Sequence, residues 1–173
     1  YRLPSGRMNN DIKQFDQLTI SYSKSNLPQK AIDLVVLGEG KNQEKYIQLA
    51  KNLEIENRVK FLGYKENPFP YYKNAIFTVL SSKNEGFPNV LIETLAVETP
   101  VISFDCFSGP SEIIQNGKNG ILVDNQDFEK LSQAMNSFID DAKLYQNCKS
   151  NAKSSIKHLE TETIGQLWLD LFK

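Results

Sequence analysis

The chain has 173 residues, of which 40% are hydrophobic and 24% are charged, and its formal net charge is -1. This length and composition predict one folded domain over residues 1–173 and leave little room for long disordered tracts. The small net charge excludes a general electrostatic attraction to phosphate backbones. We therefore expect no nucleic-acid partner and only local sites for anions.

The two cysteines, Cys106 and Cys148, lie far apart and lack the spacing of metal ligands. They predict neither a disulfide framework nor a zinc site, and they fit a reducing cytoplasm best. No apolar run approaches the ~20 residues that a membrane-spanning helix requires, and the first residues do not resemble a signal peptide. Peripheral contact with a membrane is left open.

Short apolar runs alternate with amphipathic stretches along the chain. Runs rich in β-branched residues predict strands at 32–37, 59–62, 76–80, 101–104 and 120–123. Apolar residues spaced by three or four predict helices at 11–25, 43–53, 69–74, 89–98, 111–115, 128–140, 141–158 and 161–172. This alternation is typical of a parallel sheet covered on both faces, so we expect a Rossmann-like, doubly wound α/β domain.

Ligands of such sheets bind at the carboxyl ends of the strands. The polar loops at 5–10, 38–41, 63–66 and 81–88 each follow a predicted strand, so we expect them on one rim of the sheet. The chain opens with Tyr1-Arg2-Leu3-Pro4, which lies close to the predicted end of the strand before the first of these loops. We therefore expect an N-terminal portion to be missing.

The last predicted helix carries a single apolar stripe, formed by Ile164, Leu167, Trp168, Leu171 and Phe172. Such a stripe requires a hydrophobic partner. We favour the interpretation that this helix closes the core of the same domain. The alternative is that the segment from about 159 to 173 packs toward a domain absent from this chain.

The segment EGFPNVLIE, from Glu85 to Glu93, carries the strongest chemical signal. Glu85 precedes a predicted helix start, and Glu93 lies about one turn inside that helix. The free amides and the dipole of a helix N-terminus form an anion site, here over residues 87–90. Ionised carboxylates accept hydrogen bonds from hydroxyls, so a nucleotide sugar fits the order of hexose, diphosphate and ribose. The alternative is a solvated loop residue at 85 and a residue that only compensates the helix dipole at 93.

Arg7 and Lys13 are the second element of the candidate site. Arg7 follows Gly6 at a predicted strand end, and Lys13 lies near the start of the next helix. Charge-assisted contacts from such cations would offset a diphosphate that a helix end neutralises only in part. Two solvated surface cations are the alternative.

Two other motifs are weaker. Gly38-Glu39-Gly40 lacks the third glycine of a dinucleotide fingerprint, which counts against a nicotinamide-dependent oxidoreductase and favours a tight turn. Gly109-Pro110-Ser111-Glu112 is interpreted as a turn with a helix N-cap, and the alternative is that Ser111 or the backbone contacts a ligand. The lone His158 has no ligand partner and is expected on the surface.

Seven motifs in order cover nearly the whole chain: GR with Lys13, LVVLGEG, VKFLGY, EGFPNVLIE, TPVISFD, SGPSEII and NGILV. Together they resemble the C-terminal, donor-binding domain of family 4 retaining glycosyltransferases (glycosyl transferases group 1), which have a two-domain GT-B fold. The resemblance implies that this chain is the C-terminal half of such a fold, acting as a hexosyltransferase.

The resemblance also implies roles for individual residues. Glu85 would contact the transferred sugar and Glu93 the ribose, while Arg7 and Lys13 stabilise the leaving diphosphate. The other donor-binding residues implied are Gly63 and Tyr64 beside the base, and Gly86, Phe87, Pro88, Asn89 and Val90 around the phosphate. Cations and a helix dipole neutralise the leaving group in this scheme, so we expect no metal and no cofactor.

The implied donor is a nucleotide-diphosphate hexose or N-acetylhexosamine, with uridine as the expected base. The acceptor would be a glycan or lipid-linked glycan in bacterial surface polysaccharide or glycoconjugate synthesis. Partners are then the donor, the acceptor and the chain's own N-terminal domain. The expected location is the cytoplasm, at the inner face of the cell membrane if the full enzyme associates peripherally.

Two departures from the family pattern stand out. The start YRLPSGRM is a poor apolar strand, because Pro4 weakens strand pairing. The acceptor-binding N-terminal domain is absent, so we expect donor binding but negligible turnover by this chain alone. A sugar-nucleotide-binding module without catalysis is the remaining alternative.

Overall fold

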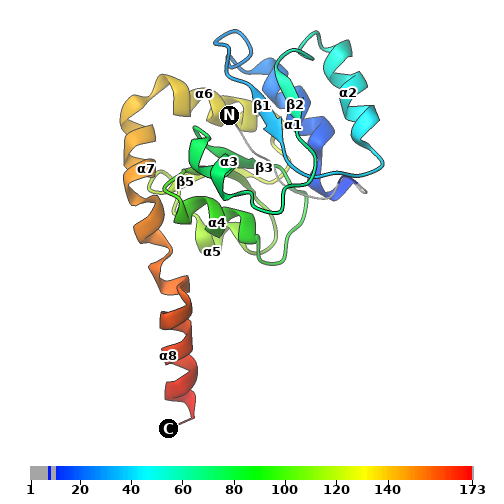
Figure 1. Cartoon of the computed structure of the whole chain (residues 1–173). Coiled ribbons are helices and arrows are strands. Elements are labelled where there is room, and N and C mark those ends of the chain that lie inside the picture. The colour runs from blue at the N-terminus through cyan, green and yellow to red at the C-terminus, as the bar shows by residue number, and fades with distance from the viewer. Residues whose placement is uncertain (1–7, 9–10, 173) are drawn as a thin grey trace.

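The computed structural model describes residue 8 and residues 11–172. Its elements follow in the order η1 (Asp11–Lys13), α1 (Phe15–Lys24), β1 (Leu34–Val36), α2 (Gln43–Asn52), β2 (Val59–Phe61), α3 (Phe69–Asn74), β3 (Thr78–Leu80), α4 (Asn89–Ala96), β4 (Val101–Asp105), α5 (Pro110–Ile113), β5 (Gly120–Asp124), α6 (Phe128–Asp140), α7 (Ala142–Ser155), η2 (Lys157–Leu159) and α8 (Thr161–Leu171) (Figure 1). The predicted alternation of strands and helices is confirmed over this part of the chain. The strand expected before Gly6 lies outside the described residues.

All strand pairs that the structure describes are parallel. β1 pairs with β2, and β3, β4 and β5 pair in that order. The parallel α/β architecture is therefore confirmed. We expected one continuous sheet, whereas the described hydrogen bonds form one two-stranded and one three-stranded sheet.

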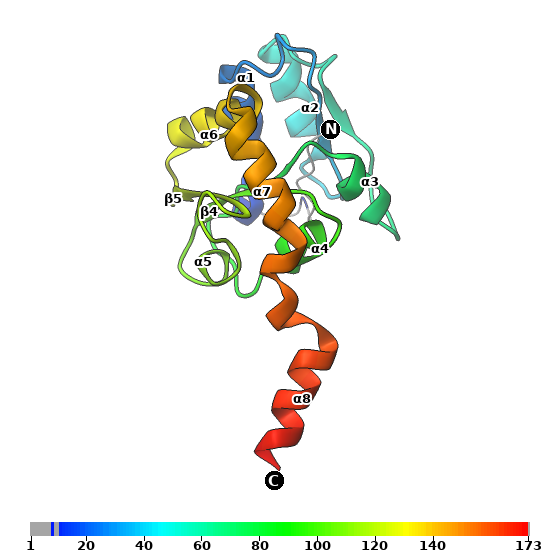
Figure 2. The same cartoon turned by 90° about the vertical axis from the view of Figure 1, so that its left-hand side faces the viewer.

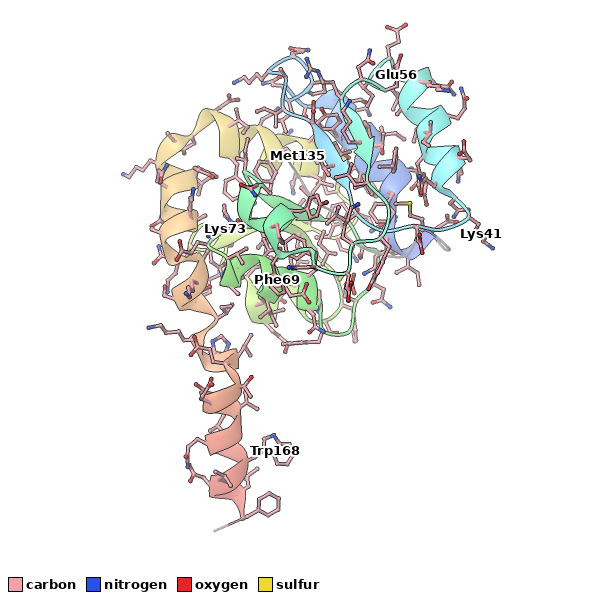
Figure 3. All side chains as sticks on the ribbon, in the orientation of Figure 1. Lys41, Glu56, Phe69, Lys73, Met135 and Trp168 are labelled. Atoms are coloured by element: carbon pink, nitrogen blue, oxygen red, sulfur yellow. The ribbon has the colours of Figure 1, made fainter. Side chains whose placement is uncertain are left out.

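Successive residues of a strand face opposite sides of the sheet, and both sides are covered here. Leu34 and Val36 belong to a core cluster with buried residues of α1, α2 and α6. Val35, between them, packs instead with Tyr72 of α3. Burial on both faces explains why the strands are continuous apolar runs. Met135 of α6 is fully buried in the first cluster (Figure 3).

The C-terminal part of the chain differs from two predictions. The helix predicted at 141–158 ends at Ser155 and is followed by the short η2 turn. The apolar stripe of α8 does not close the domain core, because none of the residues in that helix is buried. Figures 1 and 2 both show α8 extending away from the domain beyond α7.

The side chain of Trp168 is 60% exposed and projects from α8 into solvent (Figure 3). The favoured interpretation of the stripe was therefore wrong, because helical periodicity shows that a face needs a partner without showing where the partner lies. Among the described residues, no helix combines the length and apolarity needed to cross a membrane.

Gly120 is required by the close pairing of β4 and β5. A Cβ atom at this position would lie 2.5 Å from the carbonyl oxygen of Val101 and 2.8 Å from its Cγ2. We expect Gly120→Ala to lower the free energy of unfolding by about 1–3 kcal/mol, as overpacking does in other cores. Urea unfolding measures this change.

Gly165→Ala is the matched control, since a Cβ there meets no atom within 4 Å and the residue lies inside α8. Alanine favours a helix over glycine, so the control should be neutral or slightly stabilising. Equal stability of the Gly120 and Gly165 variants would contradict the close approach.

Candidate active site

The structure brings Lys13 and Glu85, 72 residues apart in sequence, into direct contact. The Lys13 Nζ atom donates to Glu85 Oε1 at 2.5 Å. Both side chains are largely enclosed, with 26% and 13% of their surfaces exposed. The contact joins the end of η1 to the loop between β3 and α4, so these two predicted site residues form one site. Arg7, the third, lies outside the described residues.

Main-chain contacts hold Lys13 in place. Ser81 Oγ donates to the Lys13 carbonyl oxygen at 2.8 Å, and the Lys83 amide donates to the Ile12 carbonyl oxygen at 2.8 Å. These bonds tie η1 to the residues that follow β3. The cation is therefore carried by a segment fixed to the rim of the sheet.

A single helix was predicted over 11–25, but the chain breaks at Gln14, whose φ of 49° is left-handed. Gln14 also makes a contact far along the chain. The side-chain amides of Gln14 and Gln126 form two reciprocal hydrogen bonds of 2.8 Å, which join this segment to the loop after β5. Long-range pairing of this kind cannot be inferred from helical periodicity.

The loops after β1 and β2 meet on the same rim. The Gly38 amide donates to the Gly63 carbonyl oxygen at 2.9 Å. The amide of Met8, which directly follows Arg7 in the chain, donates to the Glu39 carbonyl oxygen at 3.0 Å. The Gly38-Glu39-Gly40 segment therefore forms a turn that binds neighbouring backbone. Tyr64, next to Gly63, is 68% exposed.

The α4 helix begins beside Glu85. Its cap residue is Pro88, and no side chain in the described structure caps its first turn. The amides of an uncapped first turn remain available to an anion. Gly86 and Asn89 are exposed, Phe87 is 49% exposed, Pro88 is buried and Val90 is partly buried.

Glu93 lies in the second turn of α4 and is partly exposed. Within the described part of the chain, its carboxylate has no hydrogen bond or ion pair. It is therefore available to a ligand. Whether Glu85 and Glu93 contact one ligand stays a prediction.

The loop between β4 and α5 also reaches this site, which sequence reasoning missed. Ser108 Oγ lies 3.1 Å from the carbonyl oxygen of Glu85 and 3.0 Å from that of Gly86. The predicted turn with a helix N-cap is confirmed: Gly109 is the cap residue, and Glu112 Oε1 accepts from the Gly109 amide at 3.3 Å. The only available signal was that both loops follow predicted strands.

Cys106, at the end of β4, is 3% exposed. Burial raises the pKa of its thiol, and the nearby charge of Glu85 raises it further. The thiol is therefore neutral at physiological pH and adds no negative charge beside Glu85.

A hollow of about 590 Å³ lies between β2 and α3, and it is lined by Val35, Lys60, Leu62, Pro70, Tyr71 and Asn74, none of which is a predicted site residue. No cluster of His, Cys, Asp and Glu able to hold a metal ion occurs among the described residues.

Parallel strands alternating with covering helices form the Rossmann-like α/β fold of the C-terminal domain of GT-B glycosyltransferases. The sequence profile of the family described as "Glycosyl transferases group 1" matches residues 3–155, and the chain belongs to this family.

Individual relatives agree with this assignment. The chain is 33% identical over 135 residues to the N-acetylgalactosamine-N,N'-diacetylbacillosaminyl-diphospho-undecaprenol 4-alpha-N-acetylgalactosaminyltransferase of Campylobacter jejuni. That match covers 78% of this chain and 37% of the relative. The chain thus spans little more than a third of the length of this enzyme.

Solved structures superpose on nearly the whole chain. A structure of TarM from S. aureus, in complex with Fondaparinux, alpha-GlcNAc-glycerol and UDP, has a TM-score of 0.89 and 26% identity, and the match covers 99% of this chain and 35% of TarM. HepE from Anabaena, in complex with UDP, has a TM-score of 0.85 at 22% identity over 98% of this chain and 48% of HepE, a likeness that shows the fold.

The contact between Lys13 and Glu85 is testable by a double-mutant cycle. We expect Lys13→Met and Glu85→Gln to couple by about 1 kcal/mol in urea unfolding, because the pair is more enclosed than an ordinary surface pair. Lys30→Met and Asp140→Asn provide the control, since that pair is 45% and 46% exposed. The control cycle should show almost no coupling, and equal coupling in both cycles would contradict the enclosed site.

Proposed function

We propose that this chain is the donor-binding domain of a retaining glycosyltransferase. The enzyme would transfer a hexose or N-acetylhexosamine from a uridine diphosphate (UDP) sugar to a glycan or lipid-linked glycan in bacterial surface polysaccharide or glycoconjugate synthesis. The observation that carries the proposal is the contact of Lys13 with Glu85 beside the uncapped start of α4. This contact joins a cation to a carboxylate, and the amides at the start of α4 follow that carboxylate in the chain.

The donor would use these groups in order. The diphosphate binds the amides at the start of α4 together with Lys13 and Arg7. The hexose hydroxyls donate to Glu85, the ribose hydroxyls donate to Glu93, and the base lies beside Gly63 and Tyr64. An ammonium has three donors, so Lys13 can contact phosphate while it keeps its bond to Glu85.

Transfer breaks the bond between the sugar's anomeric carbon and the terminal phosphate oxygen, and the bond electrons leave with the diphosphate. Lys13, Arg7 and the helix dipole stabilise the charge that develops on this oxygen. The acceptor hydroxyl attacks the anomeric carbon on the face from which the diphosphate departs, so configuration is retained. The proton of this hydroxyl passes to the leaving phosphate oxygen.

The proposal is tested by titrating the chain with UDP and with UDP-sugars. Arg7→Ala and Lys13→Ala should each weaken UDP binding by about tenfold to a hundredfold, since a hydrogen bond to a charged group contributes about 1.5–3 kcal/mol. Isothermal titration calorimetry measures these affinities. Lys30→Ala is the control cation, because Lys30 pairs with Asp140 away from this site. Unchanged UDP affinity in both Arg7→Ala and Lys13→Ala would refute the assignment.

The exposed stripe of α8 supports a second part of the proposal. The chain covers 37% of the Campylobacter jejuni relative and 35% of TarM, and α8 buries no residue within the described domain. We propose that α8 packs on the N-terminal domain of the full protein. That domain would supply the acceptor site. It would also make the peripheral contact of the full protein with the inner face of the cell membrane.

Trp168 is the only tryptophan of the chain, so its fluorescence reports on α8 alone. In this chain we expect red-shifted emission and efficient quenching by acrylamide, because the side chain is 60% exposed. In the full-length protein, with any other tryptophans replaced by phenylalanine, emission should shift to the blue and quenching should fall. Equal quenching in both proteins would refute the packing, and a shift in this chain that depends on its concentration would indicate self-association instead.

A further inference from the structure

The loop from Cys106 to Gly109 supports the loop that carries Glu85. Besides the Ser108 hydroxyl contacts to two successive carbonyl oxygens, the backbones of the two loops approach closely. A Cβ atom at Gly109 would lie 2.6 Å from the Gly86 carbonyl oxygen and 2.5 Å from Pro88 Cδ. Only glycine permits this approach. The main chain around Glu85 is thus packed against the separate segment from Cys106 to Gly109.

This support acts on a carboxylate that is also held from the other side. Lys13 binds the Glu85 side chain, and Ser108 binds the main chain of the same residue. Gly86, which follows, is the residue that approaches Gly109, and its carbonyl oxygen also lies 3.0 Å from Ser108 Oγ. The Ser108 hydroxyl thus supplies a polar restraint on the peptide bond between Glu85 and Gly86.

A group that binds a sugar hydroxyl must be held to within about 0.5 Å, which requires supporting hydrogen bonds. We propose that Ser108 is a positioning residue that orients Glu85 toward the sugar of the donor. This inference rests on the proposed function, in which Glu85 receives the sugar and the start of α4 receives the diphosphate. Loss of the Ser108 hydroxyl would then impair recognition of the sugar more than recognition of the nucleotide.

The test compares affinities for UDP and for the UDP-hexose or UDP-N-acetylhexosamine that binds the unaltered chain most tightly. Ser108→Ala should weaken binding of the UDP-sugar about fivefold to tenfold and leave UDP binding within about twofold, since one hydrogen bond contributes about 1 kcal/mol. Ser108→Thr keeps the hydroxyl and should restore most of the UDP-sugar affinity. In a Glu85→Ala background, Ser108→Ala should cause no further loss, because the two residues act through one contact.

Ser25→Ala is the matched control. The Ser25 hydroxyl also has two main-chain contacts, donating to the Tyr22 carbonyl oxygen at 2.7 Å and accepting from the Leu27 amide at 3.4 Å. This variant should lower the melting temperature without changing the ratio of the two affinities. If Ser108→Ala is too unstable to titrate, Ser108→Cys keeps a weaker donor and permits the same comparison.

The outcomes separate the two proposals. Suppose that Glu85→Ala weakens UDP-sugar binding. The proposed role of Ser108 is then wrong, and the proposed function stands, if Ser108→Ala leaves the ratio of the two affinities unchanged as Ser25→Ala does, or lowers both affinities equally. The same conclusion follows if Ser108→Ala lowers the UDP-sugar affinity of the Glu85→Ala variant as much as it lowers that of the unaltered chain. If the unaltered chain binds neither UDP nor any UDP-sugar, or if Glu85→Ala changes neither affinity, both proposals fail.

Discussion

The candidate site depends on the contact between Lys13 and Glu85. A lysine and a glutamate enclosed to this degree lose much of their hydration, and direct contact is what compensates for that loss. The contact also fixes the geometry of the rim, since it joins the segment before α1 to the loop before α4. Hydrogen bonds from Ser81 and between Gln14 and Gln126 surround it. A cation, a carboxylate and a helix start are thereby held in one place before any ligand arrives.

The sequence predicted the elements of the fold well, because buried parallel strands are continuous apolar runs and covering helices have a regular apolar period. It also indicated that Lys13 and Glu85 would share a rim, since both follow predicted strands. The contact of Gln14 with Gln126 and that of Ser108 with Glu85 could not be predicted. Both are contacts of a side chain with a residue more than 20 positions away, and local sequence patterns do not indicate such contacts.

The C-terminal helix illustrates a different limit. Its stripe shows clearly in the sequence, yet the same stripe is compatible with a core and with an external partner. Cys148 and Ala152 of α7 are buried in the core clusters, whereas no residue of α8 is buried. It is therefore α7, and not α8, that packs against the domain. Family membership explains the fold without assigning a sugar or an acceptor to this chain.

The separation of α8 from the core has a consequence for proteolysis. The 11 residues of α8 supply none of the buried side chains. A protease that cleaves between α7 and α8 would therefore remove no part of the packed core, and the domain would keep its fold.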